Sequence, residues 1–257
     1  MESIRNITKK SAESRPVPNA DLGIERQAMN DALARFGIGY DPTPQVRASG
    51  HLLFGLDLTQ SREPTLEQAR IGTAAMFDAI AGIGNVSVKL AWYRGRYECE
   101  KSQWYDDPGI LCRSMLSLSC QAGGTKIIRL LRLALEEETK LSGMVFIGDH
   151  CEEDKGELLE LAKTLGRKSI PLFIFHESVN SDARRARGQF KKMAKLSGGA
   201  YMEFKPDSGT VLREALTTLA AFAVGGMERI ALPRTAEALN LQGQLRLMPM
   251  NAGHRRD

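Results

Sequence analysis

The sequence has few cysteines and no long apolar run. Its four cysteines stand apart, and none forms a CxxC pair, which argues against a zinc ribbon or a redox pair. The run at residues 219–224 is far shorter than the roughly 20 apolar residues of a spanning helix. No apolar core follows the basic residues near the start, so no secretory signal is expected. These features predict a cytoplasmic protein that does not interact with membranes.

Nucleotide-binding glycine motifs are also missing. No Gly-x-Gly-x-x-Gly follows the first predicted strand, no Walker Gly-Lys-Ser/Thr occurs, and Gly82-Ile83-Gly84 follows a helix instead. The net charge is only +4, and the basic residues between 184 and 192 lack an aromatic platform for bases. Nucleic acid is therefore not the expected partner, and a solvated helix face explains these charges.

The chain divides into four predicted parts. Of its 257 residues, 42% are hydrophobic, as in globular proteins. Residues 1–18 are polar and predict a flexible N-terminal arm, and residues 19–48 predict a helix (20–36) with a linker. Residues 49–226 form the main domain. The remaining tail, residues 227–257, shows little periodicity.

Strand and helix patterns alternate through the main domain. The predicted strands are residues 51–56, 85–93, 144–147, 170–175 and 200–204, with a short antiparallel edge strand at 96–100. The predicted helices are residues 64–80, 107–118, 126–140, 154–166, 181–196 and 208–224. This order predicts an α/β fold: a three-layer, Rossmann-like, doubly wound and mostly parallel sheet with one antiparallel edge strand.

Oxygen-bearing side chains stand where two of these strands end. Asp57, Thr59 and Ser61 alternate after the first strand, Asp149 follows the fourth, and Thr125 precedes a helix. Ligands of such sheets bind beyond the carboxyl ends of the strands, where these residues would converge. Two carboxylates and three hydroxyls suit a hard cation, Mg²⁺ or Mn²⁺, and leave it able to bind an external carboxylate.

The three stretches resemble the metal-ion-dependent adhesion site (MIDAS) of the von Willebrand factor A (VWA) family. That pattern is Asp-x-Ser-x-Ser, then a Thr in a glycine-rich loop, then an Asp after an apolar strand. The matching stretches are Asp57-Leu58-Thr59-Gln60-Ser61, Gly123-Gly124-Thr125 and Val145-Phe146-Ile147-Gly148-Asp149. The resemblance covers roughly residues 50–226 and points to an intracellular bacterial-type member.

The resemblance implies specific roles. Thr59 and Ser61 would touch the metal directly, Thr125 directly or through water, and Asp57 and Asp149 mainly through water. The expected partner is a protein that offers an Asp or Glu carboxylate, with an AAA+ ATPase or a stress or conflict-system component as examples. The predicted partner-binding rim consists of Gln60, Arg62, Gly124 and His150.

Two residues depart from the family pattern. Thr59 replaces the usual Ser, which keeps the hydroxyl but restricts the rotamer. Gly148-Asp149-His150 replaces the frequent Thr-Asp-Gly, so the loop after the carboxylate is bulkier.

Other functions remain open at this stage. A phosphohydrolase could use Asp57 as a nucleophile beside Mg²⁺, but Thr59 stands where such enzymes carry a second Asp. The site could also be vestigial on a VWA scaffold, and Thr125 could simply cap the following helix. No residue is assigned a catalytic role.

Overall fold

The computed structural model describes residues 50–67, 69, 72, 86–178, 180–205, 209–225 and 233–248. All of them belong to one compact unit, Asp41–Asp257. The predicted N-terminal arm, the helix at 20–36 and its linker lie outside the described residues, as does most of the helix expected to run to residue 80. Within the described part, no helix is both long and apolar enough to span a membrane.

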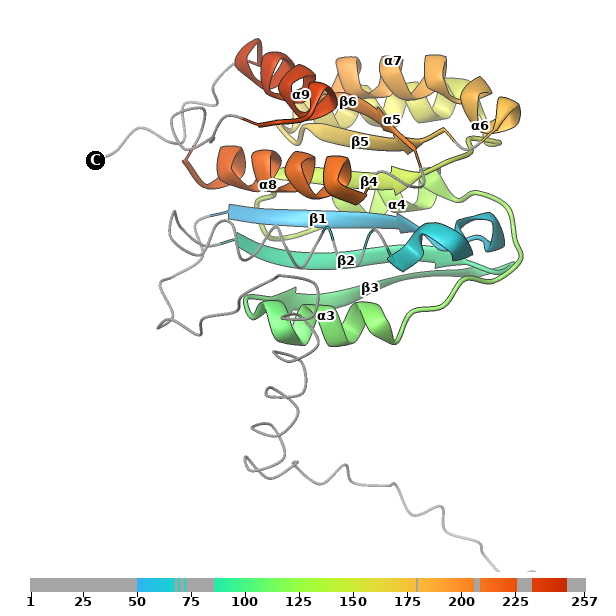
Figure 1. Cartoon of the computed structure of the whole chain (residues 1–257). Helices are drawn as coiled ribbons and strands as arrows, with labels where there is room; N and C mark the ends of the chain where they lie inside the picture. The colour runs from blue at the N-terminus through green and yellow to red at the C-terminus, as the bar shows by residue number, and fades with distance from the viewer. Residues whose placement is uncertain are drawn as a thin grey trace, which may run out of the picture. The chain divides into compact units, whose positions relative to one another are not determined.

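A six-stranded sheet forms the centre of this unit, in the order β3-β2-β1-β4-β5-β6. The strands are β1 (Gly50–Asp57), β2 (Val86–Arg94), β3 (Glu98–Tyr105), β4 (Gly143–Gly148), β5 (Leu172–Glu177) and β6 (Tyr201–Phe204). All neighbours pair in parallel except β2 and β3, which are antiparallel. The predicted mixed, mostly parallel sheet is confirmed (Figure 1).

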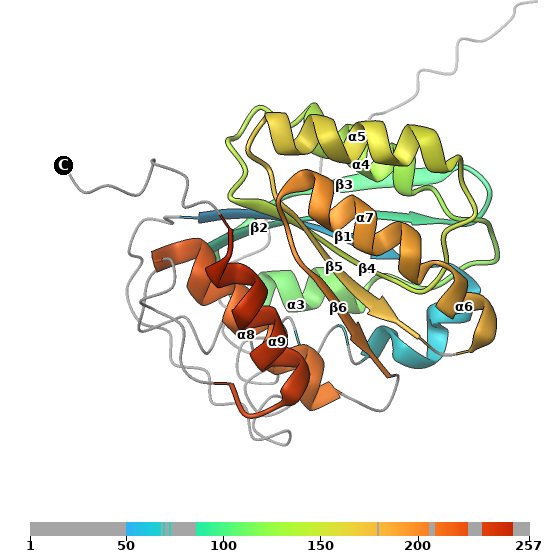
Figure 2. The same cartoon turned by 90° about the horizontal axis from the view of Figure 1, so that it is seen from above.

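Helices cover both faces of the sheet. They are η1 (Gln60–Thr65), α3 (Pro108–Leu116), α4 (Ile127–Leu135), α5 (Lys155–Arg167), α6 (Ser181–Arg185), α7 (Arg187–Ser197), α8 (Gly209–Gly225) and α9 (Ala236–Arg246). Figure 2 shows α4, α5 and α7 on one side of the sheet and α3, α8 and α9 on the other. The three-layer arrangement predicted from the alternating patterns is therefore correct.

Two apolar clusters, one on each face, hold the layers together. Alternate residues of β1 serve different clusters: Leu52, Phe54 and Leu56 pack with α3, α8 and α9, whereas Leu53 packs with α4, α5 and α7. This explains why β1 is an almost unbroken apolar run, since a central parallel strand is buried on both faces.

Several boundaries differ from the sequence prediction. β3 begins and ends later than residues 96–100, because its polar residues pair along β2 from Arg94 to Val88. A turn at Ala186 divides the helix expected at 181–196 into α6 and α7, and Asn180, not Ser181, caps it by accepting from the Asp182 and Ala183 amides.

The sequence analysis did not predict α9. Its buried residues have helical spacing, and Thr235 accepts a hydrogen bond from the Ala238 amide as an N-cap. Gly243 lies inside the helix and Pro233 lies shortly before it, and these two residues obscured the pattern. The helix nevertheless buries Leu241 and Leu245 in the cluster that contains β1.

The sheet topology indicates where a ligand is expected, namely at the carboxyl ends of β1 and β4. From β1 the chain runs outward to β2 and later returns to β4 on the other side of β1, so the order reverses between β1 and β4. Their carboxyl ends lie side by side, and Asp57 ends β1 while Asp149 follows β4. Ligands of doubly wound sheets bind at such a point.

Candidate metal centre

A compact turn holds Asp57, Thr59 and Ser61 together at the end of β1. Asp57 Oδ1 accepts hydrogen bonds from the Thr59 amide (2.9 Å) and from Thr59 Oγ1 (2.7 Å). Thr59 Oγ1 lies 3.2 Å from Ser61 Oγ. An aspartate that binds the backbone two residues on is the usual Asx-turn chemistry. Here the turn carries three oxygen-bearing side chains to one place, as the sequence predicted.

Asp149 reaches the same place from β4. Leu56 pairs with Ile147, which sets Asp57 beside Gly148 in the next register position. Asp57 and Asp149 are 2% and 0% exposed. Asp57 Oδ2 and Asp149 Oδ1 have no hydrogen-bond partner within 3.5 Å in the described part of the chain. Two buried carboxylates with open oxygens thus stand at adjoining strand ends.

Burial and mutual repulsion disfavour ionisation of both carboxylates. Burial raises the pKa of Asp57, the hydrogen bonds from Thr59 lower it, the Asp149 charge raises it again, and the Arg62 charge lowers it in part. Burial and the nearby Asp57 carboxylate also raise the pKa of Tyr93 well above its usual value. A buried carboxylate beside a second one is costly to ionise unless a positive charge compensates it.

Thr125 contacts the loop that follows Asp149. Its Oγ1 accepts a hydrogen bond from the Glu152 amide at 3.2 Å. Thr125 does not cap the following helix, which was the alternative to a role at the metal: the Glu153 carboxylate does this, accepting from the Ile127 amide and, at 3.1 Å, from the Ile128 amide. The two loops of the site are therefore joined to each other at the N-terminus of α4.

A close backbone approach fixes the glycine-rich loop. A Cβ on Gly123 would lie 2.0 Å from the Gly95 carbonyl oxygen, so no side chain fits there. Gly95 itself has φ of 54°, in the left-handed region of the β2–β3 turn. Lys126 Nζ donates to the same carbonyl at 2.6 Å. The β2–β3 turn thus holds the loop that carries Thr125.

Arg62 does not lie on the predicted partner-binding rim. The side chain is only 3% exposed and forms an ion pair with the buried Glu177. Burial lowers the pKa of Arg62, whereas the charges of Asp57 and Asp149 raise it. Arg62 is therefore a buried charge beneath the site and cannot contact a partner in this conformation.

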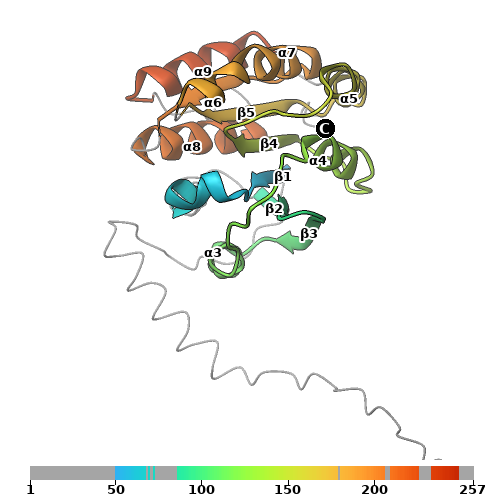
Figure 3. The ribbon, with the colours of Figure 1, turned by 90° about the vertical axis from the view of Figure 1, so that its right-hand side faces the viewer.

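The other predicted rim residues lie nearer the surface. Gln60 and Gly124 are exposed, and the His150 side chain is 24% exposed. His150 Nδ1 lies 2.8 Å from Asp149 Oδ2, so this histidine orients the carboxylate. Figure 3 faces the carboxyl ends of β1 and β4, with η1 beside β1.

Sequence reasoning missed His176. This residue of β5 is fully buried, and its Nε2 lies 3.1 Å from the carbonyl oxygens of Asp149 and Ala183. Its Nδ1 lies 2.7 Å from the Tyr201 hydroxyl. Nε2 must carry the proton to donate to these carbonyls, and Nδ1 then accepts from Tyr201. His176 thus fixes the backbone of Asp149 through a hydrogen bond to its carbonyl. No local sequence pattern predicts this contact.

The donor set fits a hard divalent cation. Asp57, Asp149, Thr59 and Ser61 offer only oxygens, and Asp57 Oδ2 and Asp149 Oδ1 accept no hydrogen bond in the described part of the chain. Among the described residues, no three His, Cys, Asp or Glu side chains are grouped to hold a metal, so a site here depends on hydroxyls completing the two carboxylates. Thr125 would supply the third hydroxyl, and its Oγ1 here accepts a hydrogen bond from the Glu152 amide in the loop that follows Asp149.

Comparison with known proteins identifies the fold. No protein-family model and no curated protein matches the chain. BatB from Bacteroides thetaiotaomicron superposes with a TM-score of 0.54 at 17% identity, over 68% of this chain and 98% of BatB. The VWA domain of SpRpn10 gives 0.51 at 16%, over 65% of this chain and 95% of that domain. This chain has the VWA fold.

Other VWA-fold matches come from longer proteins. The pilus adhesin SpaC from Lactobacillus rhamnosus GG, in its open conformation, gives a TM-score of 0.56 at 12% identity. The match covers 70% of this chain but only 30% of SpaC. At such identities the likeness establishes the fold alone, so a metal and a partner must be argued from the residues of this chain.

Packing explains one departure from the resembled motif. Gly148 stands where Thr is frequent, and a Cβ there would lie 2.5 Å from Cζ of Phe146 and 3.3 Å from Cβ of Asp57. Phe146 is 1% exposed, so its ring cannot move away easily. Phe146 takes the space that a side chain at position 148 would need.

Proposed function

We propose that this chain is a non-enzymatic, metal-dependent protein-binding module. In this proposal Asp57, Thr59, Ser61, Thr125 and Asp149 would hold Mg²⁺ or Mn²⁺ at the carboxyl ends of β1 and β4. The bound cation would take an Asp or Glu carboxylate of a partner protein as a further ligand. The VWA fold supports the proposal by supplying the scaffold on which these residues stand.

One observation carries the proposal. Asp57 and Asp149 are almost completely buried at adjoining strand ends, and each keeps an oxygen without a partner among the described residues. Ionised carboxylates in such surroundings require pairing or metal coordination. Arg62 lowers the pKa of Asp57, but it also forms an ion pair with Glu177, so this one buried cation is shared among three buried carboxylates.

The donor types also explain why an acidic partner is expected. Hydroxyl ligands are neutral, so they leave most of the charge of a divalent cation uncompensated. A cation held in this way retains affinity for one more anionic oxygen. In the free chain, Asp57, Thr59 and Ser61 are already connected by hydrogen bonds, so the site is largely preorganised.

No observation favours the phosphohydrolase alternative. Its nucleophile would be Asp57, but Oδ1 already accepts two hydrogen bonds from Thr59 and the residue is 2% exposed. A carboxylate placed in this way is better suited to orient ligands than to attack a phosphorus atom. The remaining alternative, a vestigial site, makes a different prediction for metal binding.

The decisive experiment is a titration of the full chain with Mg²⁺ and with Mn²⁺ by isothermal calorimetry. We expect one saturable site in the wild type and none in Asp57→Ala. Asp182→Asn is the matched control because that carboxylate is 63% exposed, and it should bind as the wild type does. Absence of binding in the wild type would establish a vestigial site.

The partner step is tested separately. Affinity capture from the source cells, in Mg²⁺ and in EDTA, should recover a partner only with metal, and Asp57→Ala should behave as EDTA does. Equal recovery under all three conditions would refute the metal-dependent function. Phosphatase turnover that Asp57→Asn abolishes would instead support the enzyme alternative.

A further inference from the structure

β6 is the last strand of the sheet, and on one of its sides no other strand pairs with it among the residues that the structure describes. Toward β5, the Ala200 carbonyl accepts from the Ile174 amide and the Phe204 carbonyl from the Ser178 amide. Backbone groups alternate in direction along a strand, so those of Tyr201 and Glu203 face the open side. Such an edge is a ready template for another strand.

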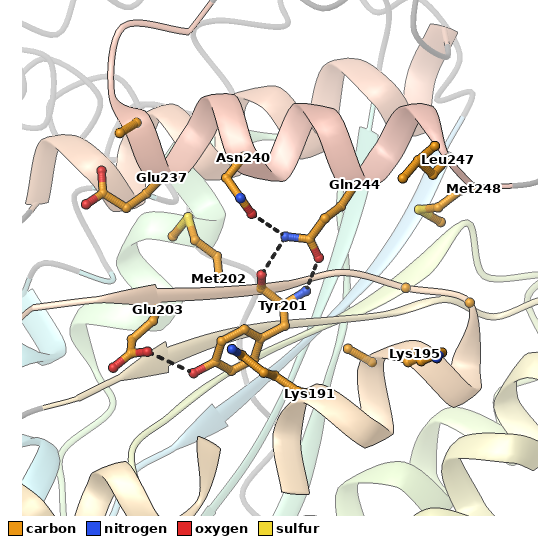
Figure 4. A pocket seen from close by; sticks show the side chains of 14 residues that line it. Lys191, Lys195, Tyr201, Met202, Glu203, Glu237, Asn240, Gln244, Leu247 and Met248 are labelled. Carbon is orange, nitrogen blue, oxygen red and sulfur yellow. Dashed lines mark hydrogen bonds between the residues drawn. The ribbon is translucent and has the colours of Figure 1, made fainter. Parts of the chain in front are cut away.

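A side-chain amide occupies part of this edge. Gln244 Oε1 of α9 accepts from the Tyr201 amide at 3.0 Å, and Gln244 Nε2 donates to the Tyr201 carbonyl at 2.8 Å. Nε2 also donates to Asn240 Oδ1 at 2.7 Å, which orients the amide (Figure 4). One acceptor and one donor on a single residue reproduce the bonding that a peptide group of a neighbouring strand would make.

A groove of about 960 Å³ runs beside this edge, between α7 and α9. Figure 4 shows its two sides: Lys191 and Lys195 of α7 lie on the side of the Tyr201 ring, and Leu247 and Met248 lie on the side of α9. Lys191 Nζ is 5.4 Å from the centre of the Tyr201 ring, and both lysines are exposed. Leu247 is 87% exposed, a large value for an apolar side chain.

We propose that this groove binds an extended segment of a partner protein, which adds to β6 as a seventh strand. The Gln244 amide acts as a stand-in for the incoming peptide group and is displaced when the segment binds. Main-chain hydrogen bonds to Tyr201 and Glu203 would then supply affinity, and the two sides of the groove would supply specificity.

The two sides also define the segment. Side chains of neighbouring strands share a face, so a residue beside Tyr201 would lie on the side of Lys191 and Lys195. A residue beside Glu203 would meet a carboxylate, so it should be uncharged. Residues beside Met202 would face the apolar side, toward Leu247 and Met248. A segment with an acidic residue beside Tyr201, an uncharged polar residue beside Glu203 and an apolar residue beside Met202 is therefore the complementary partner.

This interaction does not depend on the proposed metal site. Its residues come from α7, β6 and α9, whereas the metal site lies at the ends of β1 and β4. Binding at the groove should therefore persist in EDTA and in Asp57→Ala. Loss of metal binding would leave this inference intact, and loss of groove binding would leave the metal proposal intact.

The first test uses a short peptide of alternating threonine and valine in which one central threonine is replaced by glutamate, blocked at both ends and labelled with a fluorophore. Fluorescence anisotropy with the full chain in EDTA should show saturable binding. N-methylation of alternate peptide amides should weaken binding about tenfold in one register and little in the other, because only one set of amides faces β6. Equal losses in both registers, or no binding of the parent peptide, would overturn the proposal.

The second test uses variants of the groove. The double variant Lys191→Glu/Lys195→Glu should bind the peptide about tenfold more weakly, since both lysines no longer attract its glutamate. Lys192→Glu is the matched control, because Lys192 is exposed on the same helix but does not line the groove. An equal loss in the control would show general charge attraction and would refute the proposed site.

A third variant tests whether the Gln244 side-chain amide competes with the peptide for β6. Gln244→Ala removes the group that competes with the peptide, so binding should become tighter in the variant. Its circular dichroism and melting temperature are compared with the wild type to confirm that α9 remains folded. Weaker binding by a folded Gln244→Ala variant would contradict the assigned role of the amide.

Discussion

Replacement of Asp57 by Asn tests separately how the buried charge affects the stability of the fold and how it affects metal binding. Asn keeps an oxygen that can accept both hydrogen bonds from Thr59, so the turn should persist. The variant loses the charge of a side chain that is 2% exposed and that stands beside Asp149. In EDTA at neutral pH we therefore expect Asp57→Asn to melt at a higher temperature than the wild type.

Mg²⁺ should have the opposite effect: it should raise the melting temperature of the wild type more than that of Asp57→Asn. A ligand at about 100 times its Kd stabilises the native state by about 2.7 kcal/mol. For a domain of this size, each kcal/mol raises Tm by about 2–4 °C. The wild type should therefore gain roughly 5–11 °C with saturating Mg²⁺. Asp57→Asn should gain almost nothing, because the metal loses one of its two nearby carboxylates.

The sign of the pH dependence follows from the same shift. Burial raises the pKa of Asp57 in the folded chain above its ordinary value of 3.8. The resulting stabilisation is complete below pH 3.8 and is lost as pH rises through the folded pKa. In EDTA, the difference in melting temperature between Asp57→Asn and the wild type should therefore shrink as the pH falls toward 3.8.

Differential scanning fluorimetry with and without Mg²⁺ measures all of these effects. Asp182→Asn, at a 63% exposed carboxylate, should melt like the wild type under each condition. The reasoning would be refuted if Asp57→Asn were less stable than the wild type in EDTA, or if it gained as much from Mg²⁺.

Three further variants test the surroundings of the site. Arg62→Met should cost about 3–5 kcal/mol in urea unfolding, because it leaves the 1% exposed Glu177 buried without the Arg62 charge. Adding Glu177→Leu should restore most of this loss, and an additive double variant would contradict the pairing. Burial lowers the pKa of His176 below 6.5, so the stability it contributes is present above pH 6.5 and is lost as pH falls from 6.5 through the lower pKa of the folded chain. Urea unfolding between pH 7.5 and 5.5 should show this slope and lose it in His176→Asn. Gly148→Ala should cost about 1–3 kcal/mol because its Cβ would meet the Phe146 ring at 2.5 Å, whereas Gly243→Ala, with no atom within 4 Å, should be neutral or stabilising. Equal stability of these two glycine variants would show that Phe146 yields more easily than its burial indicates.

Local patterns predicted most of the sheet because each strand carries its own signal. The apolar run before Asp57 and the one before Asp149 required no knowledge of the rest of the chain. Parallel pairing then brings both carboxyl ends to one edge, so the convergence of Asp57 and Asp149 followed from topology alone. The boundaries of β3 could not be read in this way, since its polar residues pair along β2 without an alternating pattern.

The chemistry of the candidate site was therefore present in the sequence, in the spacing of Asp57, Thr59 and Ser61. Tertiary structure alone decided which neighbours serve those residues. Arg62 is adjacent to the motif, yet its partner Glu177 is distant in the chain, and burial turned an expected contact residue into an internal charge. Glu153 in place of Thr125 caps α4, and His176 holds the Asp149 carbonyl. Side-chain types and strand ends are local properties, whereas burial and long-range hydrogen bonds exist only once the layers pack.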